Sequence, residues 1–351
     1  MGAPMDNDRQ SVTNTISRHS SGVSPWPLLL VAGGVGLAVL ARPPAYRFAN
    51  KVVLITGGSR GLGLVLARQL AQSGAMVGLL ARNAEELSRA RTTIPAPSLV
   101  QLLVADVTMA SQVEQAVETL VQRFGRIDVV INNAGQILSA PLADTTDADF
   151  KAMIDVHVWG MLNATRAALP HLARHRDGRV INICSIGGRI PVPHLSAYCT
   201  SKFAQAGLSA VMGEELREQG VRVTTVLPGL MRTGSHLQAW FKGDQPAEFA
   251  LFSLIAGLPG TSMSAERAAR LILAAAARGD AEAIIPFTVR QIAKVAAVFP
   301  NLVLAAWRSV HRVLPPPGSR FAVQGQHLNL NPVLQAAVTL NERAADRNNQ
   351  R

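Results

Sequence analysis

The chain has 351 residues and a formal net charge of +11 at pH 7. This length suffices for one large α/β domain with extensions, and the excess of positive charge suits an anionic partner or surface. Only 2 cysteines occur, which excludes a disulfide framework as the organising device and suits a reducing compartment.

The N-terminal 41 residues divide into a polar part and an apolar part. Residues 1–25 are rich in Ser, Thr and Asn and predict a disordered tail. Residues 26–41, WPLLLVAGGVGLAVLA, carry no charge. This run is shorter than the ~20 apolar residues of a bilayer span. Three interpretations are open: a membrane anchor, a helix packed on its own domain or lying in a membrane interface, and a cleaved signal peptide.

Positive charge follows the apolar run more densely than it precedes it. Arg42, Arg47 and Lys51 come after it, whereas Arg9 and Arg18 before it are partly offset by acids. If the run is an anchor, this asymmetry predicts that the rest of the chain lies on the cytoplasmic side of a membrane. Without an anchor, the expected location is cytoplasmic.

Residues 48–286 alternate short apolar runs with amphipathic helical patterns. Strands are predicted at 52–56, 76–80, 99–105, 129–132, 180–184, 221–227 and 283–285, with helices between them, for example at 111–124, 147–171 and 197–219. This order predicts an α/β domain with a doubly wound parallel sheet, a Rossmann fold that binds ligands at the carboxyl ends of its strands.

A glycine-rich stretch follows the first predicted strand. Residues 56–63 read TGGSRGLG, with glycines at 57, 61 and 63 before a helical pattern. A strand, a glycine turn and a helix together aim bare backbone N–H groups and a helix N-terminus at a pyrophosphate. Glycine is needed because a Cβ would block the turn or the phosphate. The stretch therefore predicts a dinucleotide site.

Further motifs occur downstream in a fixed order. They are Asp106-Val107, NNAG at 132–135, Ser185, Tyr198-x-x-x-Lys202 and Pro228-Gly229. With the glycine stretch, they resemble the short-chain dehydrogenase/reductase family over residues 50–286. The resemblance implies a nicotinamide-dependent oxidoreductase, and a homodimer or homotetramer formed through the helices at 147–171 and 197–219.

The residues after the second strand predict which dinucleotide binds. Residues 79–83 read LLARN, so Ala81 stands where an NAD-binding fold places a carboxylate, and Arg82 follows it. Arg60, inside the glycine turn, offers a second guanidinium suited to a phosphate. Each arginine alone is equally explained as a solvated surface charge. Both together, without a carboxylate, predict NADP(H).

The resemblance assigns a full set of cofactor contacts. They are Gly57, Ser59, Arg60, Gly61, Leu62, Gly63, Arg82, Asp106, Val107, Asn133, Ala134, Gly135, Tyr198, Lys202, Pro228, Gly229 and Thr233, with Asn132 beside them in the NNAG motif. Two alternatives stay open: Asp106 as a cap for the helix near 111, and NNAG as an ordinary turn.

Tyr198 and Lys202 are four residues apart, so on a helix they lie one turn apart on one face. A neighbouring ammonium favours the phenolate and lowers the pKa of a phenol from about 10 toward working pH. By resemblance, Tyr198 is the proton donor, Lys202 also binds the nicotinamide ribose, and Ser185 holds the substrate carbonyl oxygen. An ordinary surface pair is the alternative for Tyr198 and Lys202.

His157 departs from the family pattern. The family carries a catalytic asparagine at this position, which helps to hold a water in a proton relay leading to the lysine. A neutral imidazole can also donate and accept, so His157 is a fourth candidate catalytic residue. Because histidine titrates near neutrality, the relay is expected to be pH-sensitive. The alternative is a buried, hydrogen-bonded histidine with no catalytic role.

The segments after the predicted sixth strand bear on the substrate and on location. Residues 235–264 hold Trp240, Phe241, Phe249, Phe252 and Ile255 where the family places its substrate lid. These side chains indicate a lipophilic substrate, or else core packing. Residues 287–320 mix cations with apolar residues and predict a helix on an anionic membrane surface, or equally a pocket cover or subunit contact. Residues 321–351 predict a loose polar tail.

The predicted function is NADPH-dependent reduction of a lipophilic ketone or aldehyde, or oxidation of the corresponding alcohol, by hydride transfer with Tyr198 as proton donor. No metal site and no nucleic-acid-binding module is predicted. The alternative is a non-enzymatic NADP(H)-binding sensor or scaffold on the same fold, because a fold does not determine function.

Overall fold

Apolar strands buried on both faces form the centre of the protein. The computed structural model describes residues 45–257, 262–330 and 339–350; the predicted tail at 1–25 and apolar segment at 26–41 lie outside them. The strands of the main sheet are β1 (Val52–Thr56), β2 (Met76–Ala81), β3 (Val100–Val104), β4 (Val129–Asn132), β6 (Gly178–Ile183), β7 (Val221–Pro228) and β11 (Glu282–Ile285). Every residue of β1 is buried, as expected for a parallel strand covered on both sides.

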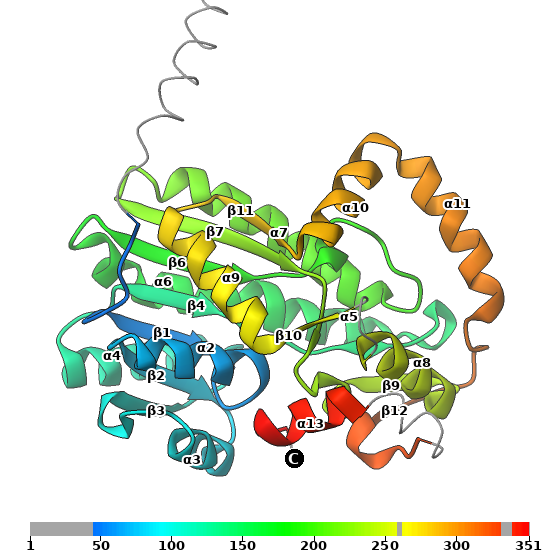
Figure 1. Cartoon of the computed structure of the whole chain (residues 1–351), viewed down its shortest axis with the longest axis horizontal. Helices are drawn as coiled ribbons and strands as arrows, with labels where there is room; N and C mark the ends of the chain where they lie inside the picture. Colours follow the sequence, from blue (N-terminus) through cyan, green and yellow to red (C-terminus); the bar gives the residue numbers. More distant parts are fainter. Residues whose placement is uncertain (1–44, 258–261, 331–338, 351) are drawn as a thin grey trace, which may run out of the picture. The chain divides into compact units, whose positions relative to one another are not determined.

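The sheet has the order β11-β7-β6-β4-β1-β2-β3, and every pairing in it is parallel. This confirms the predicted doubly wound α/β fold (Figure 1). The chain runs outward from β1 to β2 and β3, then returns to β4 on the other side of β1. Ligands bind at such a reversal, beyond the carboxyl ends of the strands.

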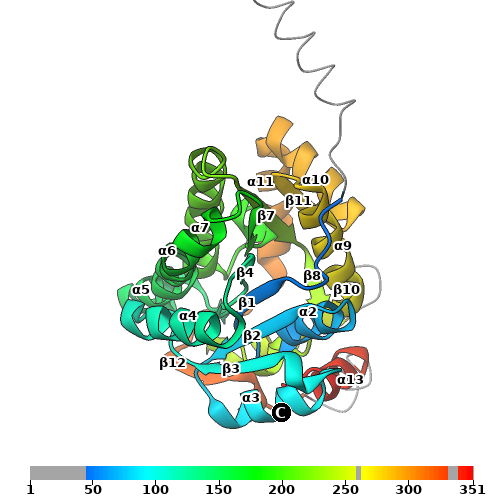
Figure 2. The same ribbon diagram turned by 90° about the vertical axis from the view of Figure 1, so that its left-hand side faces the viewer.

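Helices cover both faces of the sheet (Figure 2). One face packs on α2 (Gly61–Gln72), α3 (Ala84–Thr92) and α9 (Ala265–Arg278). The other packs on α4 (Ala110–Phe124), α6 (Gly160–Ala173) and α7 (Ser196–Glu215), and α5 (Asp147–Ile154) lies beside α7. Alternate residues of a strand pack against the two helical layers. In β1, Val53 and Ile55 pack on the side of α2, α3 and α9, whereas Val52 and Leu54 pack on the side of α4, α6 and α7.

The helix predicted at 147–171 is interrupted. A π-helical turn, η3 (Asp155–Trp159), separates α5 from α6. The extra residue in this turn brings His157 to full burial and sets Gly160 against Val107, where a Cβ on the glycine would lie 2.8 Å from the valine Cγ2. Such turns recur at functional sites. The apolar spacing on either side stays helical, so the sequence does not reveal the break.

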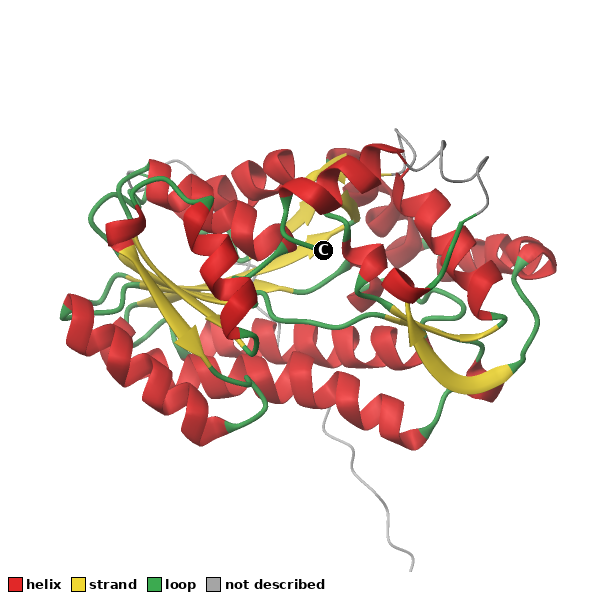
Figure 3. Cartoon of the chain, turned by 90° about the horizontal axis from the view of Figure 1, so that it is seen from below, coloured by secondary structure: helices red, strands yellow, loops and turns green. Residues whose placement is uncertain are grey.

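A second lobe stands beyond the carboxyl edge of the sheet and appears in Figure 3 as a separate group of strands. β5 (Leu138–Ser139) pairs parallel with β9 (Trp240–Gly243), and β12 (Ser319–Gln324) pairs antiparallel with β9. β8 (Leu230–Arg232) and β10 (Ser262–Ser264) form a parallel pair, and α8 (Gln245–Gly257) packs beside them.

The C-terminal residues correct the expectation of a loose tail at 321–351. β12 extends to Gln324, and α13 (Thr339–Arg347) packs against α8. Ala344 and Ala345 are buried, as are Asn348 and Gln350. Polar composition predicts exposure, but here the polar side chains bind the backbone and side chains of the Rossmann core.

The helices α10 (Phe287–Val298) and α11 (Pro300–Val310) form a bent pair that leaves most of its apolar side chains exposed. The exposed members are Phe287, Ile292, Val295, Val298, Phe299, Leu302 and Leu304. Among the described residues, no single helix is long and apolar enough to cross a membrane. Residues 287–298 and 300–313 together satisfy the same test of length and composition, with a bend of 111° between them.

Candidate active site

A cavity of about 560 Å³ opens at the carboxyl edge of the main sheet. It is lined by residues that directly follow β1, β2, β3, β4, β6 and β7, together with part of the second lobe. Of the predicted site residues, all but Gly63 line this cavity. The sheet topology therefore brings together motifs that lie as far apart in the chain as Gly57 and Thr233.

The glycine-rich turn requires its glycines for two different reasons. Gly57 and Gly61 have φ values of +65° and +57°, which side chains rarely adopt. A Cβ on Gly63 would lie 2.2 Å from the carbonyl oxygen of Gly57, so this glycine lets α2 approach the turn. No described side chain caps the N-terminus of α2. A helix N-terminus without a side-chain cap, next to a tight turn, fits the pyrophosphate of a dinucleotide.

The NNAG motif supports this turn. The backbone N–H groups of Asn133 and Ala134 donate to Thr56 Oγ1 at 3.0 and 3.1 Å, and Asn133 Nδ2 donates to the carbonyl of Gly57 at 3.0 Å. Asn132, in contrast, is buried below the cavity and donates to Asn182 Oδ1 at 2.8 Å. The motif thus joins β4 to the glycine turn and is more than a local turn signal.

Asp106 is not the cap of the next helix. Met109 is the N-cap residue of α4, and Asp106 Oδ1 instead accepts bonds from the Thr108 N–H and hydroxyl, both at 2.9 Å. Its other carboxylate oxygen lies 3.9 Å from Arg82 Nη1. Asp106 and Val107 therefore line the cavity at the end of β3.

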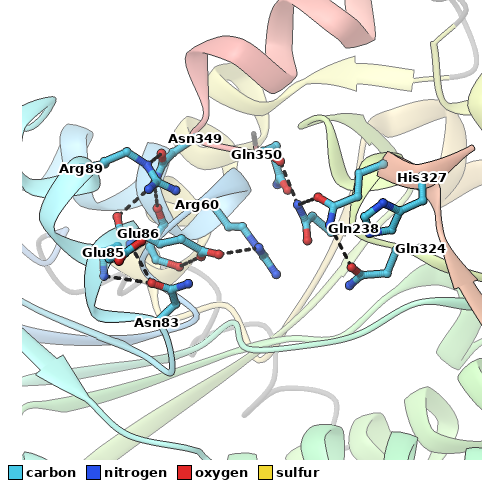
Figure 4. Close-up of polar contacts among 12 residues, drawn as sticks. Arg60, Asn83, Glu85, Glu86, Arg89, Gln238, Gln324, His327, Asn349 and Gln350 are labelled. Atoms are coloured by element: carbon cyan, nitrogen blue, oxygen red, sulfur yellow. Dashed lines mark hydrogen bonds and ion pairs between the residues drawn. The ribbon is translucent and has the colours of Figure 1, made fainter.

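A carboxylate stands beside the predicted phosphate-binding arginines. Glu86, in the first turn of α3, accepts from Arg60 Nη1 and from Ser59 Oγ, each at 3.0 Å (Figure 4). It also lines the cavity. The inference that this site lacks a carboxylate is therefore wrong. Ala81, the last residue of β2, indeed carries no carboxylate, but Glu86 in the first turn of α3 lines the same cavity and pairs with Arg60.

Ser185, Tyr198 and Lys202 meet at the inner end of the cavity. Ser185 follows β6, while Tyr198 and Lys202 lie one turn apart on α7. The Ser185 hydroxyl interacts with the Tyr198 phenol and acts to lower its pKa. Lys202 Nζ donates to Gln205 Oε1 at 2.8 Å and lies 5.8 Å from the centre of the Tyr198 ring. Lys202 is 4% exposed, so this is no surface pair.

Burial sets the protonation of these groups. It raises the pKa of Tyr198 to about 12, although the Ser185 hydrogen bond opposes the shift. It lowers the pKa of Lys202 to about 8. The expected lowering of the phenol pKa by the ammonium is therefore wrong, because desolvation raises this pKa. At neutral pH the phenol keeps its proton and can donate it.

His157 is fully buried, and both ring nitrogens have partners. Nε2 accepts from the Gln136 N–H at 3.1 Å, which leaves the proton on Nδ1 to donate to Ser201 Oγ at 2.8 Å. Ser201 in turn donates to the carbonyl of Tyr198 at 2.7 Å. Burial and the charge of Lys202 hold the pKa of His157 well below its ordinary value. The expectation that His157 titrates near neutrality is therefore wrong. Its role in a proton relay stays a prediction.

The substrate end of the cavity has a largely apolar wall. Of the aromatic residues predicted for a lid, Trp240 and Phe252 line it, whereas Phe241 and Phe249 are buried in the core of the second lobe. Sequence reasoning missed other lining residues, namely Ile137, Leu195, Met231, Gln238, Gln324 and Gln350. These come from connecting segments, from the short strands β8 and β12 and from the C-terminus, and no motif marks them.

A dinucleotide cradle that leads to a hydroxyl, a phenol and a buried ammonium defines a class of protein: the oxidoreductases that transfer hydride with a nicotinamide cofactor. Comparisons with known proteins identify the family. Residues 51–241 match the family model described as short chain dehydrogenase. The chain belongs to this short-chain dehydrogenase family and is an oxidoreductase that uses NAD(P)(H).

Relatives and solved structures agree with this assignment. An oxidoreductase of Botryotinia fuckeliana is 38% identical over 192 residues, which cover 54% of this chain and 70% of the relative. A 3-ketodihydrosphingosine reductase of Bacteroides thetaiotaomicron is 35% identical over 185 residues, which cover 52% of this chain and 65% of the relative. A short chain dehydrogenase of Burkholderia cenocepacia, crystallised with NADP, superposes with a TM-score of 0.61 at 27% identity. The match covers 77% of this chain and 100% of that structure's chain.

Proposed function

We propose that this protein reduces the carbonyl group of a lipophilic ketone or aldehyde with NADPH, or oxidises the corresponding alcohol. The observation that carries the proposal is the convergence of Ser185, Tyr198 and Lys202 on one cavity that also contains the glycine-rich turn. The bound nicotinamide would supply the hydride. The chain's own residues supply the proton and orient the carbonyl.

The proton comes from Tyr198. Its phenol is protonated at neutral pH, and the Ser185 hydroxyl interacts with it at the same cavity. A carbonyl oxygen placed between the two hydroxyls would receive two hydrogen bonds. These bonds strengthen as negative charge develops on that oxygen during hydride addition. The positive charge of Lys202, one helical turn away, favours the phenolate left behind.

The substrate class follows from the cavity wall. Ile137, Leu195 and Met231 join Trp240 and Phe252 in lining the cavity that also contains Tyr198. Such side chains favour an alkyl chain over a charged group. A relative named 3-ketodihydrosphingosine reductase points to the same chemistry. A long-chain ketone is accordingly the proposed substrate.

The test is a screen of the purified full-length protein with NADPH against aliphatic ketones of increasing chain length, including a long-chain amino ketone. Reduction is followed by the loss of NADPH absorbance and by detection of the alcohol. Catalytic efficiency should rise with chain length. If the parent protein oxidises NADPH no faster than the Tyr198→Phe variant does with every ketone tested, the proposed reaction is refuted.

The preference for NADP(H) over NAD(H) rests on Arg60 and Arg82, and Glu86 opposes it. Arg82 is largely exposed at the cavity rim, whereas Arg60 is paired with Glu86. A charge-assisted hydrogen bond contributes about 1.5–3 kcal/mol, which is roughly tenfold to hundredfold in affinity. Arg82→Ala should therefore weaken NADPH binding by at least about tenfold and leave NADH binding nearly unchanged.

Glu86→Gln should act in the opposite direction. It releases the Arg60 guanidinium and removes a negative charge beside the 2′-phosphate, so NADPH should bind more tightly. Glu85→Gln, one residue away, is the matched control because it removes the same charge without touching Arg60. Fluorescence titration of the parent and of each variant gives the dissociation constants of NADPH and NADH that test these expectations. Equal affinity of the parent for both cofactors would contradict the preference.

Association with a membrane surface is also part of the proposal. The exposed apolar residues of α10 and α11 alternate with the exposed cations Arg290, Lys294, Arg308 and Arg312, a combination that suits an anionic interface. Val289 of α10 packs against Gly229 at the cavity. A Cβ on Gly229 would lie 2.7 Å from Cγ2 of Val289. A lipid-facing α10 would thus bring the cavity near the compartment of a lipophilic substrate.

Vesicle sedimentation tests this surface. The full chain, and a variant lacking residues 1–41, should bind anionic vesicles more strongly than neutral ones. Replacing Phe299 and Leu302 together by serine should reduce binding by at least about tenfold, since each buried side chain contributes roughly 1.5–3 kcal/mol. Leu142→Ser, at an exposed apolar residue elsewhere, is the control. Unchanged binding of the double variant would refute a lipid-facing pair.

Self-association through α6 and α7 completes the proposal. Phe203 and Val211 are exposed on α7, and Trp159 is exposed next to α6. Large apolar side chains on neighbouring helices suit the face of a homodimer or homotetramer.

A further inference from the structure

The last residues of the chain lie directly on the glycine-rich turn. We call residues 339–350, which comprise α13 and the three residues after it, the C-terminal strap. The carbonyl oxygen of Asn348 accepts a hydrogen bond from the Gly61 N–H at 2.8 Å. Asn349 Nδ2 donates to the carbonyls of Ser59 at 2.9 Å and Glu86 at 3.0 Å. The strap therefore binds the turn that would hold a pyrophosphate.

The strap also connects the two walls of the cavity (Figure 4). On the nucleotide side, Arg89 Nε of α3 donates to Asn349 Oδ1 at 3.2 Å. On the substrate side, Gln238 Nε2 donates to the carbonyl of Gln350 at 2.8 Å. Residues 348–350 thus form a bridge from the Rossmann core to the second lobe, across one end of the cavity.

The base of the strap fits a prepared seat. Asn341 Oδ1 accepts from the Gly234 N–H at 3.2 Å, and its amide nitrogen contacts His236 Nδ1 at 2.9 Å. A Cβ on Gly234 would lie 2.4 Å from the Cα of Ala345, so the glycine is needed for this close approach. α13 is consequently held in place while the three residues beyond it reach the turn.

Residues 348–350 carry polar groups whose partners are missing. Gln350 lines the cavity, is 5% exposed, and its Oε1 has no hydrogen-bond partner among the described residues. Its Nε2 lies 2.7 Å from the position of a Cβ on Gly61. Asn348 is fully buried, and within the described ranges neither end of its side-chain amide is paired. Buried amides are normally satisfied. Because Gln350 lines the cavity, its unpaired amide oxygen points to a ligand there.

We propose that the C-terminal strap is a working part of the dinucleotide site: it closes the pocket over the diphosphate end of the cofactor, and Gln350 contributes its side-chain amide to the bound molecule. The inference rests on the proposed use of a nicotinamide dinucleotide. It follows that cofactor enters and leaves only when residues 348–350 lift from Gly61, Ser59 and Gln238.

The strap makes separate kinetic predictions for closure and for contact. Deleting residues 348–351 removes the bridge, so NADPH should both bind and dissociate faster. Gln350→Ala keeps the bridge, whose bonds to Gln238 and Gly61 are made by backbone oxygens. This variant should bind at the parental rate and release NADPH about tenfold faster, the equivalent of about one hydrogen bond. Arg343→Gln, on the exposed side of α13, is the control and should change neither rate.

The experiment is stopped-flow measurement of NADPH fluorescence with the full chain and these variants. It is combined with hydrogen exchange of residues 339–350, which NADPH should protect in the parent. Parental rates in the deletion variant, with exchange unaffected by NADPH, would overturn the proposal. Tighter binding after deletion would also overturn it and identify the strap as a plug. If the parent itself bound no dinucleotide, the proposed function would fail instead.

Discussion

Tyr198→Phe is expected to reduce the turnover number by roughly 10²–10⁴-fold, the usual contribution of a positioned general acid. The substitution removes one hydroxyl and keeps the ring, which packs edge-on against His157 with 5.6 Å between ring centres. NADPH affinity should therefore change little. Burial raises the pKa of Tyr198 to about 12, so the parental phenol is protonated throughout the neutral range. The loss should therefore be constant below the Lys202 pKa of about 8.

Steady-state kinetics on an active ketone, with NADPH titration of the same sample, measure both effects. Ser185→Ala is a useful companion, because it removes the hydroxyl that interacts with the phenol and leaves the proton donor. It should lower turnover less than Tyr198→Phe does. Retention of the parental turnover number by Tyr198→Phe would show that another group protonates the carbonyl.

Lys202→Met should damage both turnover and cofactor binding, and it should remove a pH dependence. Burial lowers the pKa of Lys202 to about 8, so the ammonium is charged below this pH and neutral above it. If the charge assists reduction, the parental rate should fall as pH rises through about 8. The loss should reach roughly tenfold to hundredfold, the value of a charge-assisted hydrogen bond. Lys202→Met should show the low rate at every pH.

The profile separates Lys202 from its neighbours. Tyr198 loses its proton only near pH 12, and the pKa of His157 is held well below its ordinary value by burial and by the charge of Lys202 itself. Neither group titrates near pH 8. Methionine fills nearly the same volume, so circular dichroism should confirm an intact fold. A parental profile that stays flat up to pH 10, which is two units above the Lys202 pKa of about 8, would exclude a role for the charge.

Local spacing was sufficient for much of the fold and of the reacting groups. Short apolar runs separated by helical patterns predicted the parallel sheet, because burial on both faces demands continuous apolar strands. The spacing of Tyr198 and Lys202 predicted one helix face, and α7 places them so. The π-helical turn at 155–159 could not be predicted, because a single extra residue leaves the apolar pattern on both sides intact.

The surroundings of the cofactor site depended on contacts between distant residues. Glu86 lies on α3. Its distance along the chain from the end of β2 does not indicate that it pairs with Arg60. The strap is the stronger case: Asn349 binds Ser59 across 290 positions of the chain. Its polar composition is that of a solvent-exposed tail, and burial becomes favourable only because the Rossmann core and the second lobe offer matching donors and acceptors.

The sequence by itself determined the family, the sheet and the candidate catalytic residues Ser185, Tyr198 and Lys202, because glycine turns, strand periodicity and helical spacing each act over a few residues. The tertiary structure alone decided the pairing of Arg60 with Glu86, the protonation of the phenol and the ammonium, and the contact of the C-terminus with the glycine-rich turn. These depend on which groups exclude water and which partners meet across the cavity, and both are set by packing between elements far apart in the chain.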